Sequence, residues 1–177
     1  MGIKSRLTDI SELRTIAVQF RRAIECVRDD WDHIIDDSDD VSYETASTFR
    51  IFTGYPVACC DKSCALLIRY LYELGFTGAY SINGGRRDDL TVRHEWIRIG
   101  GVTIDITADQ FDLNPRAQAV IVSCNSTWHF RRYKIVGIRA YSQGWTAWHY
   151  NRDFVRSLEE FYNVILSQME SASLHLM

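Results

Sequence analysis

The pattern of apolar positions predicts a long amphipathic helix near the N-terminus. In the segment SELRTIAVQFRRAIECVRDDWDHII, apolar residues recur at steps of three and four, which places them on one face of an α-helix. The residues of this stripe are Leu13, Ile16, Ala17, Phe20, Ile24 and Val27. Ser11 precedes the stripe and is the candidate N-cap. We expect this helix to pack one face on a core.

The same spacing returns after Pro56. Proline disfavours a helical conformation in the residue before it, so we expect a second helix to start between Ala58 and Cys60. Its apolar stripe consists of Leu66, Leu67, Tyr70, Leu71 and Leu74. Gly75 supplies the C-terminal stop. Residues 41–57, which separate the two helices, show no regular period and are expected to be irregular.

Beyond Phe76 the period changes to two, which is typical of strands. TGAYSI at 77–82 predicts a short strand, and NGGRRDD at 83–89 predicts a polar turn. Residues 91–107 alternate around two adjacent glycines and predict a hairpin.

Two further strands are expected at 117–124 and 129–138, and a helix at 151–170 closes the chain. Helices followed by an antiparallel sheet and a last helix indicate an α+β fold. We expect a single domain over residues 1–177, made of an N-terminal helical extension (1–53), a core (54–150) and a C-terminal helix (151–177).

Composition narrows the class of protein. The chain is 46% hydrophobic and 24% charged, as in soluble globular proteins, and its net charge of -3 gives nucleic acid or an anionic membrane no electrostatic attraction. It has no apolar run of about 18 to 20 residues and no apolar secretory leader. Arg6 stands where a myristoylation motif requires Ser or Thr. We therefore expect a cytoplasmic protein without a nucleic-acid or membrane partner, while delivery to another cell stays open.

The five cysteines do not predict a disulfide framework or a four-cysteine zinc site, because their number is odd and no Cys-x-x-Cys pair occurs. We expect no metal and no cofactor. The acidic stretch DDWDHIIDDSDD lacks the glycine and the glutamate of a calcium loop and predicts a solvated loop. Free cysteine is usually buried, so Cys26, Cys64 and Cys124 are expected in the core and Cys59 in a structural role.

The hairpin at 91–107 fixes which side chains share a face. If the turn centres on Gly100-Gly101, residues whose numbers sum to 201 lie opposite each other, and His94, Trp96 and Asp105 then lie on the same face. Asp105 becomes the diagonal neighbour of His94, and such neighbours have Cα atoms about 7 to 8 Å apart. A carboxylate at that distance can reach an imidazole.

A cysteine at a helix N-terminus, a histidine and an aspartate together form a chemically coherent set. A thiol with an ordinary pKa of about 8.5 is a weak nucleophile, and a helix N-terminus and a nearby imidazolium stabilise the thiolate. The histidine transfers protons, and a carboxylate on its other nitrogen fixes its tautomer. Cys60, His94 and Asp105 are the residues of these types in this order.

These residues carry a resemblance to a known family. Cys60 opening a helix that ends in Leu71, Leu74 and Gly75-Phe76, followed by HEW at 94–96 and IDIT at 104–107, resembles the transglutaminase-like branch of the papain-like cysteine enzymes. The resemblance covers about residues 54–111 and implies a papain-like core, with Cys60 as nucleophile, His94 as general base and Asp105 as its orienting partner. Arylamine N-acetyltransferases share this order.

Two positions depart from the family pattern. Glu95 stands where a small residue is usual, and Ala58-Cys59 replace a glycine-rich approach to the nucleophile. One oxyanion donor is expected to be the Cys60 backbone amide. Gln110 is the candidate for the second donor, and Trp96 is a further candidate for orienting the substrate.

The remaining aromatic residues downstream allow two interpretations. They are Trp128, Trp145, Trp148, His129 and His149. These side chains either line a substrate cleft or, as we favour, belong to the core and its rim.

The triad predicts a cysteine-dependent amide hydrolase or acyl transferase that forms an acyl-enzyme on a protein or peptide substrate. The family resemblance implies a peptidase, an isopeptidase, or a glutamine deamidase or transglutaminase. We favour hydrolysis because the chain has no evident phosphate-binding loop for coenzyme A. The alternatives are an arylamine N-acetyltransferase-like enzyme and a catalytically inactive papain-like binding or scaffold protein.

Overall fold

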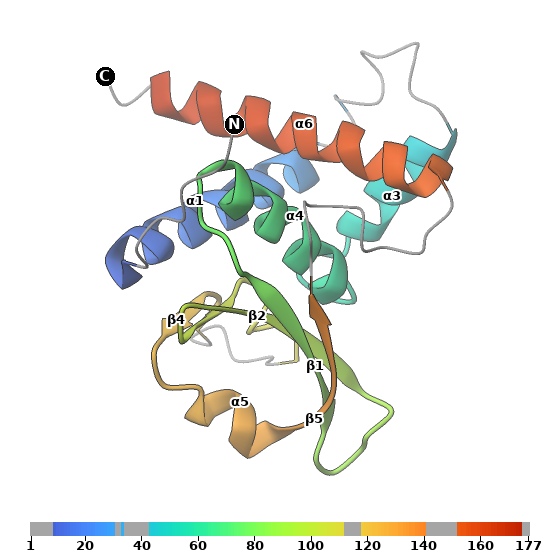
Figure 1. Cartoon of the computed structure of the whole chain (residues 1–177). Helices are drawn as coiled ribbons and strands as arrows, with labels where there is room; N and C mark the ends of the chain where they lie inside the picture. The colour runs from blue at the N-terminus through green and yellow to red at the C-terminus, as the bar shows by residue number, and fades with distance from the viewer. Residues whose placement is uncertain (1–8, 31–32, 34–42, 112–117, 141–151, 175–177) are drawn as a thin grey trace.

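The computed structural model describes residues 9–30, 33, 43–111, 118–140 and 152–174. They form a mixed fold of helices and one antiparallel sheet, as the α+β prediction requires (Figure 1). The helices are α1 (Ile10–Asp29), α3 (Tyr43–Phe52), α4 (Cys60–Glu73), α5 (Thr127–Arg132) and α6 (Arg152–Leu174). The strands are β1 (Tyr80–Arg86), β2 (Arg93–Ile99), β3 (Val102–Asp105), β4 (Ile121–Ser123) and β5 (Tyr133–Ala140).

The five strands are ordered β4-β3-β2-β1-β5, and every neighbouring pair is antiparallel. Helices α1, α3, α4 and α6 gather at one side of the sheet, and α5 lies away from them (Figure 1). The main core lies between these four helices and the sheet, and it includes the apolar stripes expected for α1 and α4. A smaller cluster of Ile82, Trp96 and Tyr133 lies apart from it, with Tyr80 and Trp128 packed against it.

The helix starts follow local chemistry. Helix α4 begins at Cys60, as expected, and ends at Glu73 with Leu74 as its C-cap. Gly75 follows with a φ of 89°, a conformation that glycine adopts without steric cost. Helix α1 is capped by Asp9 instead of Ser11, because the Asp9 Oδ1 accepts the backbone N–H of Ser11 at 2.8 Å. Ser11 is thus inside the first turn.

Two helices occupy segments that we expected to be irregular or extended. Helix α3 forms within the supposedly irregular stretch 41–57, because Phe49 and Phe52 pack on Phe161 of α6 at 4.9 and 4.2 Å between ring centroids. Residues 129–132 belong to α5 rather than to a strand, and the strand begins only at Tyr133. In both segments contacts with other elements determine the secondary structure more than the local sequence pattern does.

Strand β1 runs through Gly84 and Gly85, which we expected in a turn. A Cβ added at Gly84 would lie 2.6 Å from the ring of Trp96 and 2.8 Å from the Cβ of Tyr133. Glycine therefore lets the strand pass directly over these rings, and the register of β1 against β5 shifts at this point.

The register predicted for the hairpin is confirmed. Strands β2 and β3 pair Ile97 with Ile104 and Ile99 with Val102, so the paired numbers sum to 201. Gly100 and Gly101 both have positive φ, of 52° and 84°, as a tight two-residue turn requires.

The cysteine predictions were correct for Cys64 and wrong for Cys26 and Cys124. Cys64 is buried, whereas Cys26 and Cys124 are exposed. Cys26 lies off the buried stripe of α1, and Cys124 follows the short edge strand β4. The acidic stretch beyond Asp30 falls almost wholly outside the described residues. Trp145, Trp148 and His149 also lie outside them.

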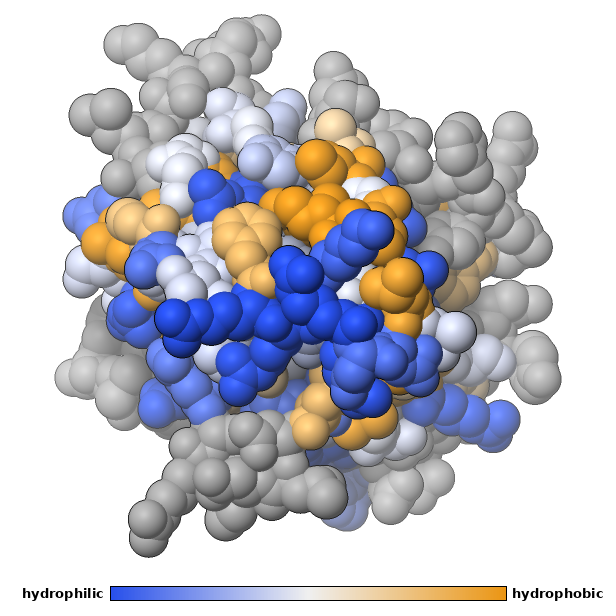
Figure 2. All heavy atoms as spheres, turned by 90° about the horizontal axis from the view of Figure 1, so that it is seen from below, coloured by the Kyte–Doolittle hydropathy of each residue, from blue (hydrophilic) through white to orange (hydrophobic). Residues whose placement is uncertain are grey.

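The surface seen in Figure 2 carries a band of hydrophilic side chains beside hydrophobic ones. Exposed apolar side chains on α5 and β5 are Phe130, Ile135, Val136 and Ile138. Within the described ranges, no helix combines the length and the apolar character that a membrane crossing demands.

Candidate active site

Cys60 is the first residue of α4, and the loop before it is tightly constrained. Ala58 has a φ of 58° and Cys59 is the N-cap, whose carbonyl accepts the N–H of Ser63 at 2.8 Å. The first backbone N–H groups of a helix have no intrahelical acceptor. The partly buried Cys60 thiol therefore lies beside free donors and the positive end of the helix dipole.

The neighbouring cysteines are poorly suited to nucleophilic chemistry. The Cys59 thiol is buried and lies 3.0 Å from the carbonyl oxygen of Ile51 and 3.1 Å from that of Val57. Burial raises the pKa of Cys59 to about 12 and raises the pKa of Cys64 well above its usual value. Cys60 is left as the candidate nucleophile of this helix.

His94 on β2 and Asp105 at the end of β3 form a buried pair. The distance from His94 Nε2 to Asp105 Oδ2 is 2.7 Å, and both side chains have no exposed surface. Burial lowers the pKa of His94, but the charge of Asp105, its hydrogen bond and the nearby Cys60 side chain outweigh burial and raise that pKa to about 10. The contribution of Cys60 to this shift means that its side chain lies near the imidazole. The predicted triad residues thus lie together.

Asp105 has more partners than the sequence indicated. Its Oδ1 accepts the backbone N–H of Thr107 at 2.9 Å and the Thr107 hydroxyl at 3.3 Å. Its Oδ2 also lies 2.8 Å from Nε2 of His129, on α5. The sequence placed His129 either in a substrate cleft or, as we favoured, among core and rim aromatics. It gave no signal for this contact because residues 129–132 were expected in a strand.

Gln110 also reaches the histidine. The Gln110 side chain is largely buried, and its Nε2 contacts His94 Nδ1. An amide that donates to Nδ1 suits the neutral ring, and the same amide turned over can accept from the protonated ring through its oxygen. Gln110 therefore lies on the ring nitrogen that is free of Asp105.

Trp96 lies behind the site rather than at its surface. Its side chain is fully buried, and its ring contacts those of His94 at 5.9 Å, His129 at 4.7 Å and Tyr133 at 5.7 Å between centroids. Its Nε1 has no hydrogen-bond partner among the residues that the structure describes. Trp96 thus supports both imidazoles by packing.

Glu95 does not face the imidazole. Successive side chains of a strand point to opposite faces, and the buried Glu95 carboxylate bonds to Ser81 Oγ at 2.5 Å and Asn83 Nδ2 at 3.3 Å on β1. The same alternation puts Arg93 on the face opposite His94. An open hollow of about 370 Å³, lined in part by Arg93 and Arg139, is thereby separated from the site by the sheet.

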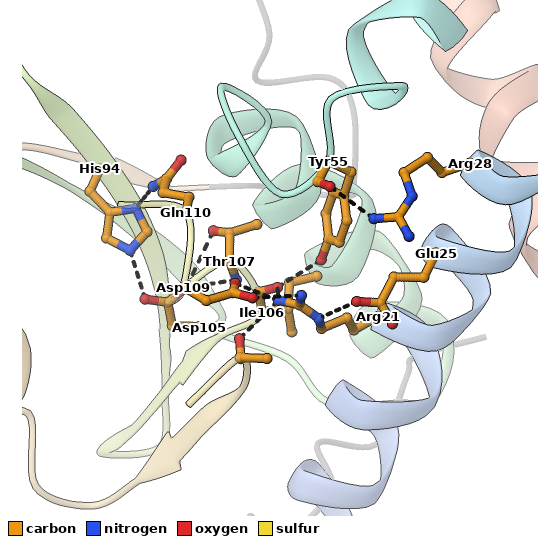
Figure 3. A network of polar contacts seen from close by, with 11 residues as sticks. Arg21, Glu25, Arg28, Tyr55, His94, Asp105, Ile106, Thr107, Asp109 and Gln110 are labelled. Carbon is orange, nitrogen blue, oxygen red and sulfur yellow. Dashed lines mark hydrogen bonds and ion pairs between the residues drawn. The ribbon is translucent and has the colours of Figure 1, made fainter. Parts of the chain in front are cut away.

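A buried guanidinium fixes the segment that carries the site's acid and amide. Arg21 of α1 forms a two-pronged ion pair with Asp109 at 2.8 and 2.9 Å, and it donates to the carbonyls of Ile106 at 2.8 Å and Ala119 at 3.0 Å. The Tyr55 hydroxyl donates to the same Ile106 carbonyl at 2.7 Å. Figure 3 shows this network running from α1 to the residues around His94.

His94, Asp105 and His129 form the one group of potential metal ligands found within the described ranges. Two ligands that share a zinc ion at about 2.0 to 2.1 Å in tetrahedral geometry would lie roughly 3.3 Å apart. The contacts of 2.7 and 2.8 Å to a single carboxylate oxygen are instead those of charge-assisted hydrogen bonds. The geometry thus favours proton sharing over metal coordination.

Comparison with known proteins adds no relative to this picture. No family model matches the chain, and no curated protein and no solved structure matches it significantly.

Proposed function

We propose that the protein is a cysteine-dependent amide hydrolase or acyl transferase with a papain-like arrangement of Cys60, His94 and Asp105. The observation that carries the proposal is the buried bond of 2.7 Å between His94 and Asp105, with the Cys60 side chain close enough to the same imidazole to raise its pKa. A thiol, a base and an orienting carboxylate in contact are the parts that acyl transfer through cysteine requires.

The proposed reaction has two stages. The Cys60 thiolate attacks a substrate carbonyl carbon, and the intermediate collapses when the C–N bond breaks and the leaving amine takes a proton from His94. The resulting thioester is then attacked by water or by an amine, whose proton passes to His94. Asp105 keeps the imidazole in one orientation through both stages, and Nδ1 is the nitrogen that exchanges protons, because Nε2 faces Asp105.

Two donors are proposed for the oxyanion. The Cys60 backbone N–H lies at the first position of α4 and has no partner within the helix. The Gln110 amide, already at His94 Nδ1, supplies the second donor once a substrate carbonyl displaces it from the ring. Losing one such donor lowers kcat by about 100-fold or more in other enzymes.

A protein or peptide is the proposed substrate. Cys60 is partly accessible whereas His94 is fully buried, so the acyl group must arrive from the Cys60 side. Phe111 follows Gln110, is 43% exposed and lies edge-on to His94 at 6.0 Å. It offers an apolar surface for a substrate side chain next to the reacting atoms. We favour hydrolysis of an amide over acyl transfer from coenzyme A, because the chain has no evident phosphate-binding loop.

The test is the pH dependence of iodoacetamide alkylation at each cysteine, followed by mass spectrometry in the wild type and in His94→Gln. We expect Cys60 to label rapidly below pH 8 and the substitution to slow it. The exposed Cys26 and Cys124 serve as ordinary thiols within the same sample. If Cys60 labels no faster than these two, or if His94→Gln leaves its profile unchanged, the proposal fails and a scaffold role takes its place.

The acceptor is identified separately. A labelled amine joined to a glutamine substrate indicates a transglutaminase, ammonia release indicates a deamidase, and a new peptide terminus indicates a peptidase. A Cys60→Ser variant is the matched control, because it changes one atom at the nucleophile.

A further inference from the structure

Two imidazoles share one oxygen of Asp105. The Oδ2 atom lies 2.7 Å from His94 Nε2 and 2.8 Å from His129 Nε2, and none of the three side chains has exposed surface. A carboxylate oxygen offers two lone pairs, so these contacts use both. The proposed function assigns a role to His94 and Asp105, and leaves His129 without one.

The surroundings of His129 hold its ring in place. The ring is parallel to that of His94, with an interplanar angle of 1° and 6.2 Å between centroids. It packs on Trp96 and Trp128, each at 4.7 Å. The contact with Asp105 therefore belongs to a packed cluster and does not depend on a mobile side chain.

Helix α5, which carries His129, is itself anchored to the sheet. Ser126, directly before α5, is buried, and its hydroxyl bonds to the Thr103 hydroxyl of β3 and to Arg98 of β2. This anchor is independent of Asp105. It fixes the start of α5 over the two strands that carry His94 and Asp105.

The partners of Asp105 explain how its charge is maintained in a buried position. Burial raises the pKa of this carboxyl, but the charge of His94 and the hydrogen bonds from His129 and His94 hold it well below its usual range. The Asp105 charge in turn raises the pKa of Tyr55, of Cys64 on α4 and of Tyr133 at the start of β5, and the Cys60 side chain acts on His94. Of all these groups, His94 and His129 are the two whose side chains bond to the carboxylate.

We infer that His129 is a positioning residue of the Cys60 site, which holds Asp105 ionised and immobile so that Asp105 can orient His94. The inference rests on the proposed function. Without His129, Oδ2 loses one of its two donors and the carboxylate keeps only His94 on that side. The predicted consequence is a His94 ring that is less firmly oriented and protonated, and a less reactive Cys60.

The experiment compares His129→Gln with His129→Leu. A glutamine amide can donate to Asp105 as the imidazole does, whereas leucine fills a similar volume without a donor. Alkylation of Cys60 by iodoacetamide is measured from pH 5 to 9, with Cys26 and Cys124 as internal references. Hydrogen bonds to a charged group contribute about 1.5 to 3 kcal/mol, so we expect His129→Leu to slow Cys60 at pH 6 by about ten- to a hundredfold. His129→Gln should recover most of that loss.

A purely structural role predicts a different result. Equal profiles in the two variants, or a wild-type profile in His129→Leu, would overturn the inference. His94→Gln, run in parallel, separates the two proposals: if it alters Cys60 while His129→Leu does not, the function stands and the role of His129 falls. If neither substitution alters Cys60, both proposals fail.

A measurement on the wild-type protein covers the case in which His129→Leu does not fold. With ¹⁵N-labelled histidine, NMR identifies which ring nitrogen carries the proton. We expect His129 to be protonated on Nε2, with this proton hydrogen-bonded and slow to exchange, as for His94. A His129 ring whose Nε2 carries no proton would contradict the inference.

Discussion

Removing the buried Arg21 guanidinium should weaken the fold and the site together. The substitution Arg21→Met keeps most of the aliphatic length and deletes the fork that joins α1 to the segment after β3. That fork makes two bonds to Asp109 and one each to the carbonyls of Ile106 and Ala119. The Arg21 side chain is only 8% exposed, so water cannot readily replace it.

The size of the stability loss follows from the polar groups that the substitution leaves without a partner. Breaking a buried ion pair by removing one partner costs about 3 to 5 kcal/mol. The Asp109 carboxylate is 22% exposed and can recover some hydration, and the Ile106 carbonyl keeps its bond from Tyr55. We therefore expect a loss of about 3 kcal/mol in the free energy of unfolding, at the lower end of that range. Arg21→Lys, which keeps the charge and loses the two-pronged geometry, should lose less.

Urea unfolding monitored by tryptophan fluorescence measures this loss. The matched control is Arg69→Met, because Arg69 pairs with Glu73 at 2.5 Å on the surface of α4, with 31% and 38% of the two side chains exposed. Such a surface pair contributes about 0.5 kcal/mol or less. If Arg21→Met unfolds within 1 kcal/mol of the wild type, or no more easily than Arg69→Met, the reasoning about the buried fork is refuted. Cys60 alkylation in folded Arg21→Met should also slow, since the fork borders Asp105 and Gln110.

Substitutions at three further positions test separate features. His94 binds its proton more tightly in the folded state, with a pKa of about 10 against an ordinary 6.5. The stability that His94 contributes is thus complete below pH 6.5 and lost as the pH rises through 10. The urea midpoint should therefore fall more between pH 7 and pH 10 in the wild type than in His94→Gln. Equal decreases in the two proteins would contradict this prediction. Gly84→Ala should lower the free energy of unfolding by about 1 to 3 kcal/mol through overpacking, because the new Cβ would lie 2.6 Å from the ring of Trp96. An unchanged thermal midpoint would contradict this prediction. Ala58 has a φ of 58°, so Ala58→Val should lower the free energy of unfolding by at least about 1 kcal/mol. Ala58→Gly should stay within about 1 kcal/mol of the wild type. Similar thermal midpoints for the two variants would show that the backbone relaxes.

The local sequence pattern was sufficient to predict the part of the site that lies in the hairpin. The two-residue period and the adjacent glycines determined the register of β2 on β3, and with it the contact between His94 and Asp105. The start of α4 at Cys60 followed from Pro56 and the spacing of leucines. These features depend on residues that are close in sequence.

The remaining parts depend on contacts between distant segments. Arg21 and Asp109 are 88 residues apart, and nothing in either segment indicates the other. Helix α3 gains its stability from Phe161 on α6, and His129 reaches Asp105 only because its segment is a helix anchored by Ser126. Sequence periodicity reports which face of an element is apolar, and it does not report which polar groups meet across the core.

The adjacent cysteines at the start of α4 give the protein its own indicator of local unfolding. Cys59 is buried beneath the backbone of residues 51–57, whereas Cys60, the next residue, is partly accessible. A reagent that alkylates Cys60 directly can alkylate Cys59 only when the helix start opens. The rate of Cys59 alkylation, compared with that of the ordinary exposed thiol of Cys26, therefore measures the free energy of that opening. It does so at the same place in the chain as the proposed nucleophile and without an engineered residue.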